Sequence, residues 1–427
     1  MFSAEDHLHM ARALRLAEQG LFTTTPNPRV GCVIVKDGVV VGEGWHVRAG
    51  EPHAEVHALR AAGERSQGAT AYVTLEPCSH HGRTPPCANA LIDAGIARVV
   101  AAMCDPNPQV SGRGLELLTL AGILVQTGLL ESEARELNIG FISRMTRGRP
   151  WVRLKTASSL DGKTALLNGE SKWITGAAAR ADVQRWRARA CVILTGGGTV
   201  LADDPQMNVR DIETPRQPLK VIVDSHLMTP PSAKILHGGA FIACAEANPT
   251  RRAALEAAGA QILELPGADG RVDLVALMHE FGRQGINEVH VEAGATLNGA
   301  LLATGLVDEW ISYVAPVAMG HSARGLFEMP ALTEMAGRRL FEIRDVRTVG
   351  SDIRLTLRPR ESDFMTAPVS RLKDPDMQAA PKALIRAAEN ARRLAERTGT
   401  PFVVREPSPT HEVLTESAKT EERGDSV

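Results

Sequence analysis

The sequence predicts an α/β protein with two domains in series, each built from helices packed over a sheet. Three observations support this prediction. Short segments rich in β-forming residues alternate with helical runs, as they do in α/β folds. A short stretch at residues 146–150, containing Gly and Pro, interrupts the alternation before a new strand begins at Trp151. The chain has 427 residues, of which 44% are apolar, and this is enough for two or three cores.

The first domain, residues 1–145, begins with a helix and a β-hairpin. Residues 3–20 carry an apolar stripe, and Ser3 with Asp6 matches the Ser-x-x-acid pattern that caps a helix start. The pair Asp37-Gly38 is typical of a tight hairpin turn between two strands. The remaining elements are expected as strands at 30–35, 39–44, 70–75, 98–103 and 123–127, and as helices that begin near His53 and Cys87 or cover 115–121 and 131–141. This order predicts a three-layer domain.

One imidazole and two thiols of this domain form a candidate metal site. His53 stands in the segment Pro-His-Ala-Glu, while Cys78 and Cys87 bracket a loop after the strand expected at 70–75. Three such ligands leave the fourth tetrahedral position of zinc open to water, as in catalytic zinc sites. Bound zinc lowers the pKa of that water to about 7. Glu55 follows His53 by two residues and is placed to move protons, so we predict a hydrolytic site.

The local pattern places these side chains where helices begin. On a regular helix, residues two apart point in nearly opposite directions, so His53 and Glu55 can share a site only at a helix start. Pro52 suits such a start. Cys87 follows two prolines and opens the next helical run, where the helix dipole stabilises a thiolate.

Other residues near this motif leave alternatives open. His57 is a rival ligand one helical turn after His53, and we interpret it as packing against or supporting the site. His80 and His81 lie between the cysteines and are expected to contact substrate or solvent. Residues 105–114 form either an ordinary loop or the substrate lip of the site. The ligand types favour zinc, but iron is an open alternative.

The second domain, residues 151–359, twice places a glycine turn after a buried strand. Residues 190–194 enter Gly196-Gly197-Gly198, and residues 288–292 enter a turn at Gly294 that opens a helix. Such turns let the backbone approach a phosphate closely. The triple glycine is weak evidence, because flexible loops look the same. Neither turn has the Gly-x-Gly-x-x-Gly spacing of a dinucleotide-binding Rossmann fold.

These motifs resemble two known enzyme types joined in one chain. His-x-Glu followed by Pro-Cys resembles the zinc-dependent nucleobase deaminases, although eight residues separate the cysteines here instead of two. The long loop ending in Gly-Arg-Thr-Pro-Pro-Cys, and Pro-Asn-Pro-Arg-Val-Gly at residues 26–31, are similar to the deaminase of riboflavin biosynthesis. Further motifs are similar to the reductase of the same pathway: Leu-Lys-x-Ala-x-Ser-Leu-Asp-Gly-Lys, Ser-x-Trp-Ile-Thr, Gly-Thr-Val-Leu-Ala-Asp-Asp-Pro and Val-Glu-Ala-Gly-x-Thr-Leu.

From about residue 4 to residue 359 the chain thus resembles the bifunctional deaminase–reductase family of riboflavin biosynthesis. The resemblance implies a cytidine-deaminase-like zinc domain followed by a dihydrofolate-reductase-like domain. The first would hydrolytically deaminate 2,5-diamino-6-ribosylamino-4(3H)-pyrimidinone 5′-phosphate, with zinc on His53, Cys78 and Cys87 and with Glu55 as the catalytic proton carrier. The second would use NADPH to reduce the ribosyl group to ribityl.

The resemblance also implies binding residues of the reductase. Positions that match those facing NADPH are Ala157, Trp173, Thr199, Asp203, Ser225, Gly294, Ala295, Thr296, Leu297, Asn298, Gly299 and Ala300. Positions that match those facing the substrate are Lys155, Ser171, Arg187, Met207, Arg210 and Glu292. Arg187 and Arg210 are expected to clamp phosphate, because a guanidinium group pairs with phosphate at two points.

The charge balance and the apolar runs of the sequence indicate which partners and which cellular location to expect. The net charge of −2 and the absence of a basic run favour a small phosphorylated pyrimidine over nucleic acid as the partner. A nucleic-acid base deaminase is the alternative, and it would need a basic face. A non-catalytic binding protein is a third hypothesis, which loss of Glu55 or of a ligand would favour. With no secretion signal and no apolar run long enough to span a bilayer, we expect a cytoplasmic protein without membrane contact. A homo-oligomer is compatible with the sequence.

The C-terminal extension, residues 360–427, lies outside the resemblance. We expect a linker at 360–376, an amphipathic helix at 381–397, a short strand at 401–404 and a polar, disordered tail from 412. The sequence assigns it no function.

Overall fold

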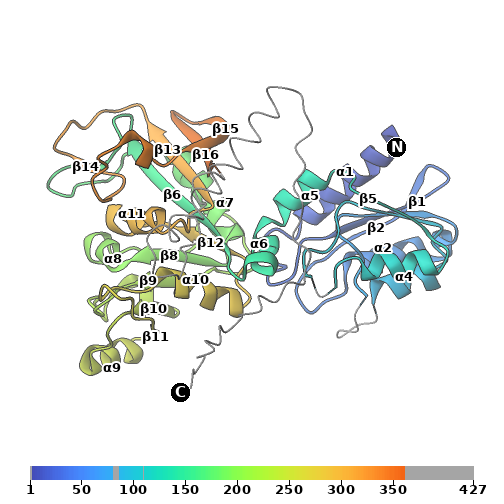
Figure 1. Cartoon of the computed structure of the whole chain (residues 1–427), viewed down its shortest axis with the longest axis horizontal. Helices are drawn as coiled ribbons and strands as arrows, with labels where there is room; N and C mark the ends of the chain where they lie inside the picture. Colours follow the sequence, from blue (N-terminus) through green and yellow to red (C-terminus); the bar gives the residue numbers. More distant parts are fainter. Residues whose placement is uncertain (1, 80–85, 109, 361–427) are drawn as a thin grey trace, which may run out of the picture. The chain divides into compact units, whose positions relative to one another are not determined.

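The computed structural model of the chain describes residues 2–79, 86–108 and 110–360. Within it, residues 1–360 form one compact unit that contains two large sheets. Figure 1 shows that the early part of the chain builds the first sheet and that the chain from β6 onward builds the second. The predictions for residues 361–427, and those for His80 and His81, lie outside the described residues.

The first sheet has five strands in the order β2-β1-β3-β4-β5. Strands β1 and β2 form the predicted hairpin, whose turn residues Asp37 and Gly38 both have positive φ. Strand β1 is also antiparallel to β3, whereas β3, β4 and β5 are parallel. The strands are β1 (Gly31–Lys36), β2 (Val39–Trp45), β3 (Thr70–Val73), β4 (Arg98–Ala101) and β5 (Leu124–Thr127).

Helices cover both faces of this sheet. Helix α1 (Ala4–Glu18) begins with the predicted capping box between Ser3 and Asp6. It packs so closely on β1 that a Cβ at Gly31 would lie 2.0 Å from a backbone oxygen of α1. Gly44, which pairs with Cys32 and so faces the other side, abuts α2 (Ala54–Ala62) in the same way. The three-layer prediction is therefore confirmed. The other helical elements here are η1 (Gly63–Ser66), α3 (Cys87–Asp93) and α4 (Arg113–Leu120).

The single helix predicted over residues 131–141 is wrong. It is divided at Asn138 into α5 (Glu131–Leu137) and α6 (Ile139–Arg147). The Asn138 side chain accepts a hydrogen bond from the backbone N–H of Arg29 and donates one to its carbonyl. This long-range pairing fixes Asn138 in place, and no local pattern reveals it.

The connection between the domains is shorter than predicted. Helix α6 continues through Arg147, inside the expected linker 146–150, so three residues lead to the second sheet. Ser143 donates a hydrogen bond to the carbonyl of Arg149. Both Arg147 and Arg149 pair with Asp308 at 2.7 Å. The connection is thus held at both of its ends.

The second sheet has nine strands in the order β11-β10-β9-β8-β12-β6-β13-β16-β15. The strands from β11 to β13 in this order are parallel, and β16 and β15 complete the sheet with antiparallel pairings. The strands are β6 (Trp151–Ser159), β8 (Val192–Gly196), β9 (Leu219–Val223), β10 (Ala240–Cys244), β11 (Ala260–Glu264), β12 (Glu288–Val291), β13 (Glu309–Ala315), β15 (Phe341–Val349) and β16 (Asp352–Pro359); β7 (Lys163–Ala165) pairs only with β14 (Arg324–Gly325).

The helices of the second domain correct one further expectation. Gly197 and Gly198, expected in a loop, form the first turn of α8. The helical elements here are α7 (Ala177–Arg189), α8 (Gly197–Asp203), η2 (Lys234–Leu236), α9 (Pro249–Ala257), α10 (Leu274–Arg283), α11 (Ala295–Ala303) and η3 (Met335–Gly337). In the part of the chain that the structure describes, no helix has both the length and the apolar character needed to cross a membrane.

A buried group of charges ties the N-terminal segment to the second sheet. Glu288, on β12, pairs with Arg29 at 2.7 Å, with Arg153 at 2.9 Å and with Arg189 at 2.7 Å. Arg153 also pairs with Glu309 at 2.5 Å. Burial alone would raise the pKa of Glu288, but the three guanidinium groups hold it well below its usual range.

Candidate active sites

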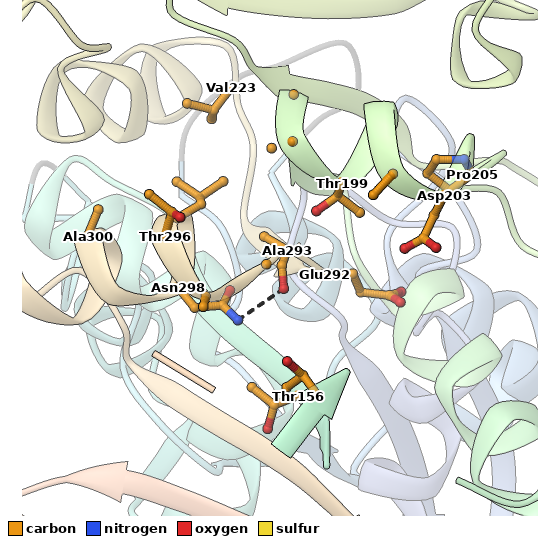
Figure 2. A pocket seen from close by; sticks show the side chains of 18 of the residues that line it. Thr156, Thr199, Asp203, Pro205, Val223, Glu292, Ala293, Thr296, Asn298 and Ala300 are labelled. Atoms are coloured by element: carbon orange, nitrogen blue, oxygen red, sulfur yellow. Dashed lines mark hydrogen bonds between the residues drawn. The ribbon is translucent and has the colours of Figure 1, made fainter. Parts of the chain in front are cut away.

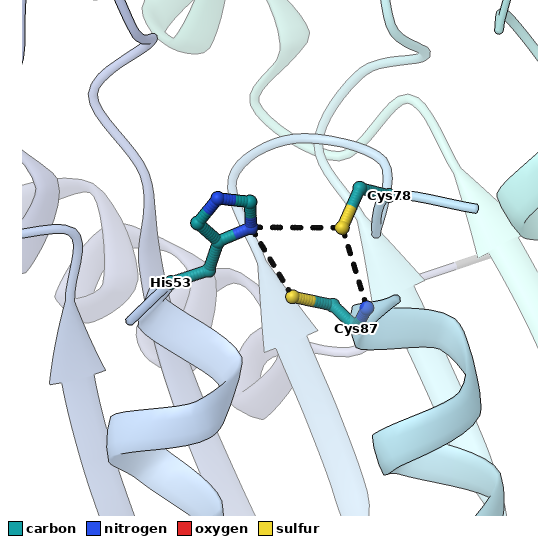
Figure 3. Close-up of side chains that lie close together, drawn as sticks. All are labelled: His53, Cys78 and Cys87. Atoms are coloured by element: carbon teal, nitrogen blue, oxygen red, sulfur yellow. Dashed lines mark hydrogen bonds between the residues drawn. The ribbon is translucent and has the colours of Figure 1, made fainter. Parts of the chain in front are cut away.

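The predicted metal ligands come together at the carboxyl edge of the first sheet. His53 is the N-cap of α2, Cys78 follows β3, and Cys87 is the first residue of α3. Figure 3 shows the imidazole of His53 facing both sulfur atoms. Its Nδ1 lies 3.6 Å from Cys78 Sγ and 3.3 Å from Cys87 Sγ.

These distances fit a tetrahedral zinc ion. Bond lengths of about 2.0 Å to nitrogen and 2.3 Å to sulfur place such ligand atoms roughly 3.5 Å apart. All three ligand atoms lie within 4.8 Å of one another, and His57 is not part of the group. Instead, His57 packs near Gly44 of β2, as the packing interpretation expected. Hydrogen bonding to Cys87 and His53 lowers the pKa of the Cys78 thiol, which favours the thiolate that metals bind.

Glu55 lies in the first turn of α2, as the helix start requires. The residue is 3% exposed, and its Oε2 atom has no hydrogen-bond partner among the described residues. Burial, and then the nearby Cys78, raise the pKa of Glu55 to about 7. A carboxyl group with this pKa can both accept and release a proton near neutral pH.

Two residues near this centre were not singled out from the sequence. His46, just after β2, donates a hydrogen bond from Nδ1 to the carbonyl of Pro52 at 3.2 Å, and its ring centroid lies 5.2 Å from that of His53. Asn27 Nδ2 lies 3.1 Å from His46 Nε2. The only sequence signal was the position of His46 at the end of a strand and of Asn27 in the Pro-Asn-Pro motif.

The second domain contains an open cavity of about 1700 Å³ at the carboxyl ends of β6, β8 and β12. Figure 2 shows Thr199, Glu292 and Asn298 among the residues around it. Except for Gly299, the residues predicted to face NADPH or substrate all line this cavity. Gly299 instead lies against Glu328, where a Cβ would be 1.9 Å from the Glu328 carbonyl oxygen.

A buried ion group lies on one side of the cavity. Arg187 pairs with Glu292 through Nε at 2.5 Å and Nη2 at 3.0 Å, and Lys155 Nζ lies 3.7 Å from the same carboxylate. Burial alone would raise the pKa of Glu292, but Arg187 and Lys155 hold it well below its usual range. Burial lowers the pKa of Lys155.

The two arginines expected to clamp phosphate differ in their surroundings. Arg187 is buried, and its remaining Nη1 donates to the Asn208 carbonyl at 2.8 Å, so its guanidinium is already committed to protein partners. Arg210 is exposed and lines the cavity, with one side-chain hydrogen bond at 3.1 Å to Asn208 Oδ1 among the described residues. Of the two, Arg210 is the one with donors available for a ligand.

Two family models match the chain. The model of the cytidine and deoxycytidylate deaminase zinc-binding region matches residues 3–103, and that of the RibD C-terminal domain matches residues 150–355.

Similar proteins match most of the chain. The riboflavin biosynthesis protein RibD of Escherichia coli is 53% identical over 365 residues, covering 83% of this chain and 99% of that protein. RibD of Haemophilus influenzae is 48% identical, covering 84% and 99%. Among solved structures, RibD of Acinetobacter baumannii (form 1) has a TM-score of 0.78 at 49% identity, covering 84% of this chain and 99% of that one. A deaminase/reductase of Thermotoga maritima has a TM-score of 0.74 at 34% identity, covering 83% and 99%.

Proposed function

We propose residue assignments for the two reactions of this chain. The chain belongs to the RibD family of bifunctional deaminase–reductases in riboflavin biosynthesis. The enzyme hydrolytically deaminates 2,5-diamino-6-ribosylamino-4(3H)-pyrimidinone 5′-phosphate and then reduces the ribosyl side chain with NADPH, giving 5-amino-6-ribitylamino-2,4-pyrimidinedione 5′-phosphate. Its cofactors are zinc and NADPH.

For the deamination, we assign His53 Nδ1 and the sulfur atoms of Cys78 and Cys87 as zinc ligands. Bound zinc supplies hydroxide at neutral pH by lowering the pKa of its water. Glu55 takes one proton of the attacking water at Oε2 and delivers it to the ring nitrogen. It then takes the proton of the newly added hydroxyl group and delivers it to the amino group, which departs as ammonia. The observation that carries this assignment is the buried Oε2 of Glu55, which has no hydrogen-bond partner among the described residues, together with three atoms at zinc-ligand spacing.

For the reduction, we assign the side of the cavity around Glu292 to the opened sugar. NADPH supplies the hydride, so the protein needs little acid–base machinery and acts mainly by orientation. Lys155 and Glu292 orient the sugar, Arg187 holds Glu292 in place, and Arg210 binds the phosphate. The strand-to-helix turns at Thr199 and Gly294 line the cavity and support the assignment of that part to NADPH.

We also propose the domain limits 1–145 and 151–359, which the two separate sheets and the two family matches support. A cytoplasmic location and a homo-oligomeric state are further proposals that follow from the family. Cell fractionation and sedimentation analysis would test them.

The test of the assignment separates the two half-reactions. Wild type and Glu55→Gln are assayed for ammonia release from the diaminopyrimidine phosphate and, separately, for NADPH oxidation with the already deaminated compound. We expect the variant to lose ammonia release by about 100-fold or more while it still oxidises NADPH. Equal ammonia release by both proteins would refute the role of Glu55, and loss of both activities would mean that the variant is misfolded.

A further inference from the structure

Glu76 is a buried carboxylate to which the mechanism above gives no role. The residue is 5% exposed and lies two positions before Cys78. Its Oε2 accepts hydrogen bonds from the backbone N–H groups of Asp105 and Gly112, and its Oε1 accepts one from Gly114, each at 2.9 Å. One carboxylate therefore gathers three amides from both ends of a single stretch, whose described residues are 105–108 and 110–114 and which is called segment 105–114 below.

The sheet places this segment beside the metal ligands. Strands β3 and β4 are parallel neighbours, with Val73 opposite Ala101, so the residues that follow them emerge at the same edge. The backbone N–H of Glu76 also donates to the carbonyl of Met103 at 2.9 Å. The packing is close, because a Cβ at Gly114 would lie 1.9 Å from the Pro77 carbonyl oxygen. Segment 105–114 thus begins and ends against the backbone that leads into Cys78.

The chemistry of the contact requires a carboxylate. Gly112 is the N-cap of α4, and a negative charge is favourable at a helix start. Both oxygens of an ionised carboxylate accept hydrogen bonds, and such bonds are stronger than neutral ones. A glutamine has one acceptor oxygen, and its NH₂ group would face a backbone N–H instead of accepting from it.

We propose that Glu76 is a positioning residue that holds segment 105–114 as the substrate lip of the deaminase site. This proposal rests on the proposed deaminase function. It assigns Glu76 no contact with the substrate or metal. Its effect is on substrate binding, because the lip is set before the substrate arrives and the bonds of the Glu76 carboxylate go to the amides of the lip.

Two variants and one matched control test the proposal. Glu76→Gln removes the charge, and Glu76→Asp keeps it on a shorter side chain. Asp6→Asn is the control, because Asp6 is a similarly buried carboxylate of the same domain that bonds Arg98, Tyr72 and the Ser3 backbone. For each protein, KM and kcat of ammonia release, zinc per chain, NADPH oxidation and amide hydrogen exchange of residues 105–114 are measured.

We expect Glu76→Gln to raise the KM of ammonia release about tenfold or more and to change kcat less than about threefold. Its zinc content and NADPH oxidation stay at wild-type values, and amide exchange at residues 105–114 becomes faster. Glu76→Asp is expected to show a smaller rise in the KM of ammonia release. If the glutamine variant does not fold, the aspartate variant alone tests the proposal. Asp6→Asn lowers stability without raising KM.

Four outcomes would overturn the proposal. An unchanged KM in both Glu76 variants would mean that the segment is no lip. Zinc loss, or an equal rise of KM in Asp6→Asn, would mean that Glu76 acts only through the stability of the domain. If wild type releases no ammonia, the proposed function itself fails and the proposal falls with it.

Discussion

Replacing Glu288 by glutamine is expected to lower the thermal stability of the compact unit formed by residues 1–360. On heating, we expect the variant to lose its deaminase and reductase activities together, at a lower temperature than the wild type. Glu288 is fully buried and pairs with three guanidinium groups, those of Arg29, Arg153 and Arg189. Removing one member of a buried ion group leaves uncompensated charge and costs about 3–5 kcal/mol. For one cooperative unit formed by residues 1–360, such a loss corresponds to a decrease in Tm of roughly 5 °C.

The assay follows thermal inactivation of ammonia release and of NADPH oxidation in the same samples. Because Arg29 belongs to the N-terminal segment and Glu288 to the second sheet, we expect both inactivation curves to shift by the same amount. The matched control is Glu131→Gln, which breaks an exposed pair with Arg135 worth about 0.3–0.5 kcal/mol. If Glu288→Gln shifted Tm no more than this control, the charge argument would be refuted.

The same group predicts a pH dependence. The pKa of Glu288 is lowered in the folded protein, so its contribution to stability is complete above its ordinary pKa of 4.5 and is lost as the pH falls toward the folded value. The difference in unfolding free energy between wild type and Glu288→Gln should therefore shrink in acid. A difference that grew as the pH fell would contradict the assigned sign.

Three further predictions concern the sites. Cys87→Ser should remove the metal and ammonia release while NADPH oxidation continues, as metal analysis and the two assays would report; retained zinc would exclude Cys87 as a ligand. Glu292→Gln should lower kcat/KM of the reduction about 10- to 100-fold without affecting ammonia release, because Arg187 and Lys155 lose their shared partner. Arg210→Met should raise the KM of the reduction about tenfold with little change in kcat, and an effect confined to kcat would argue against phosphate binding.

The deaminase site could be predicted from sequence because its elements are local. His53 and Glu55 are placed by one helix start, and Cys78 and Cys87 by a strand end and another helix start. The capping box of α1 and the turn at Asp37 follow from equally short patterns. In each case the residues that define the structure lie within a few positions of one another.

The features that local patterns do not reveal depend on contacts between distant residues. The break at Asn138 arises from its bonds to Arg29, which is more than a hundred positions away. The pairing of Arg187 with Glu292, which joins α7 to the end of β12, is another such contact. Gly299 was expected to face NADPH from the family resemblance, and its close approach to the Glu328 backbone is a third. Helical and strand periodicity carries no information about such contacts.

The short connection after α6 has a consequence for how the deaminated intermediate moves between the two catalytic centres. Residues 148–150 can span no more than about 10 Å even when fully extended. Arg147 and Arg149 both form ion pairs with Asp308, and these pairs further restrict the movement of the connection. Ion pairs on both sides of the connection favour a fixed arrangement of the two sheets over hinge motion. We therefore expect the deaminated intermediate to reach the second centre by diffusion.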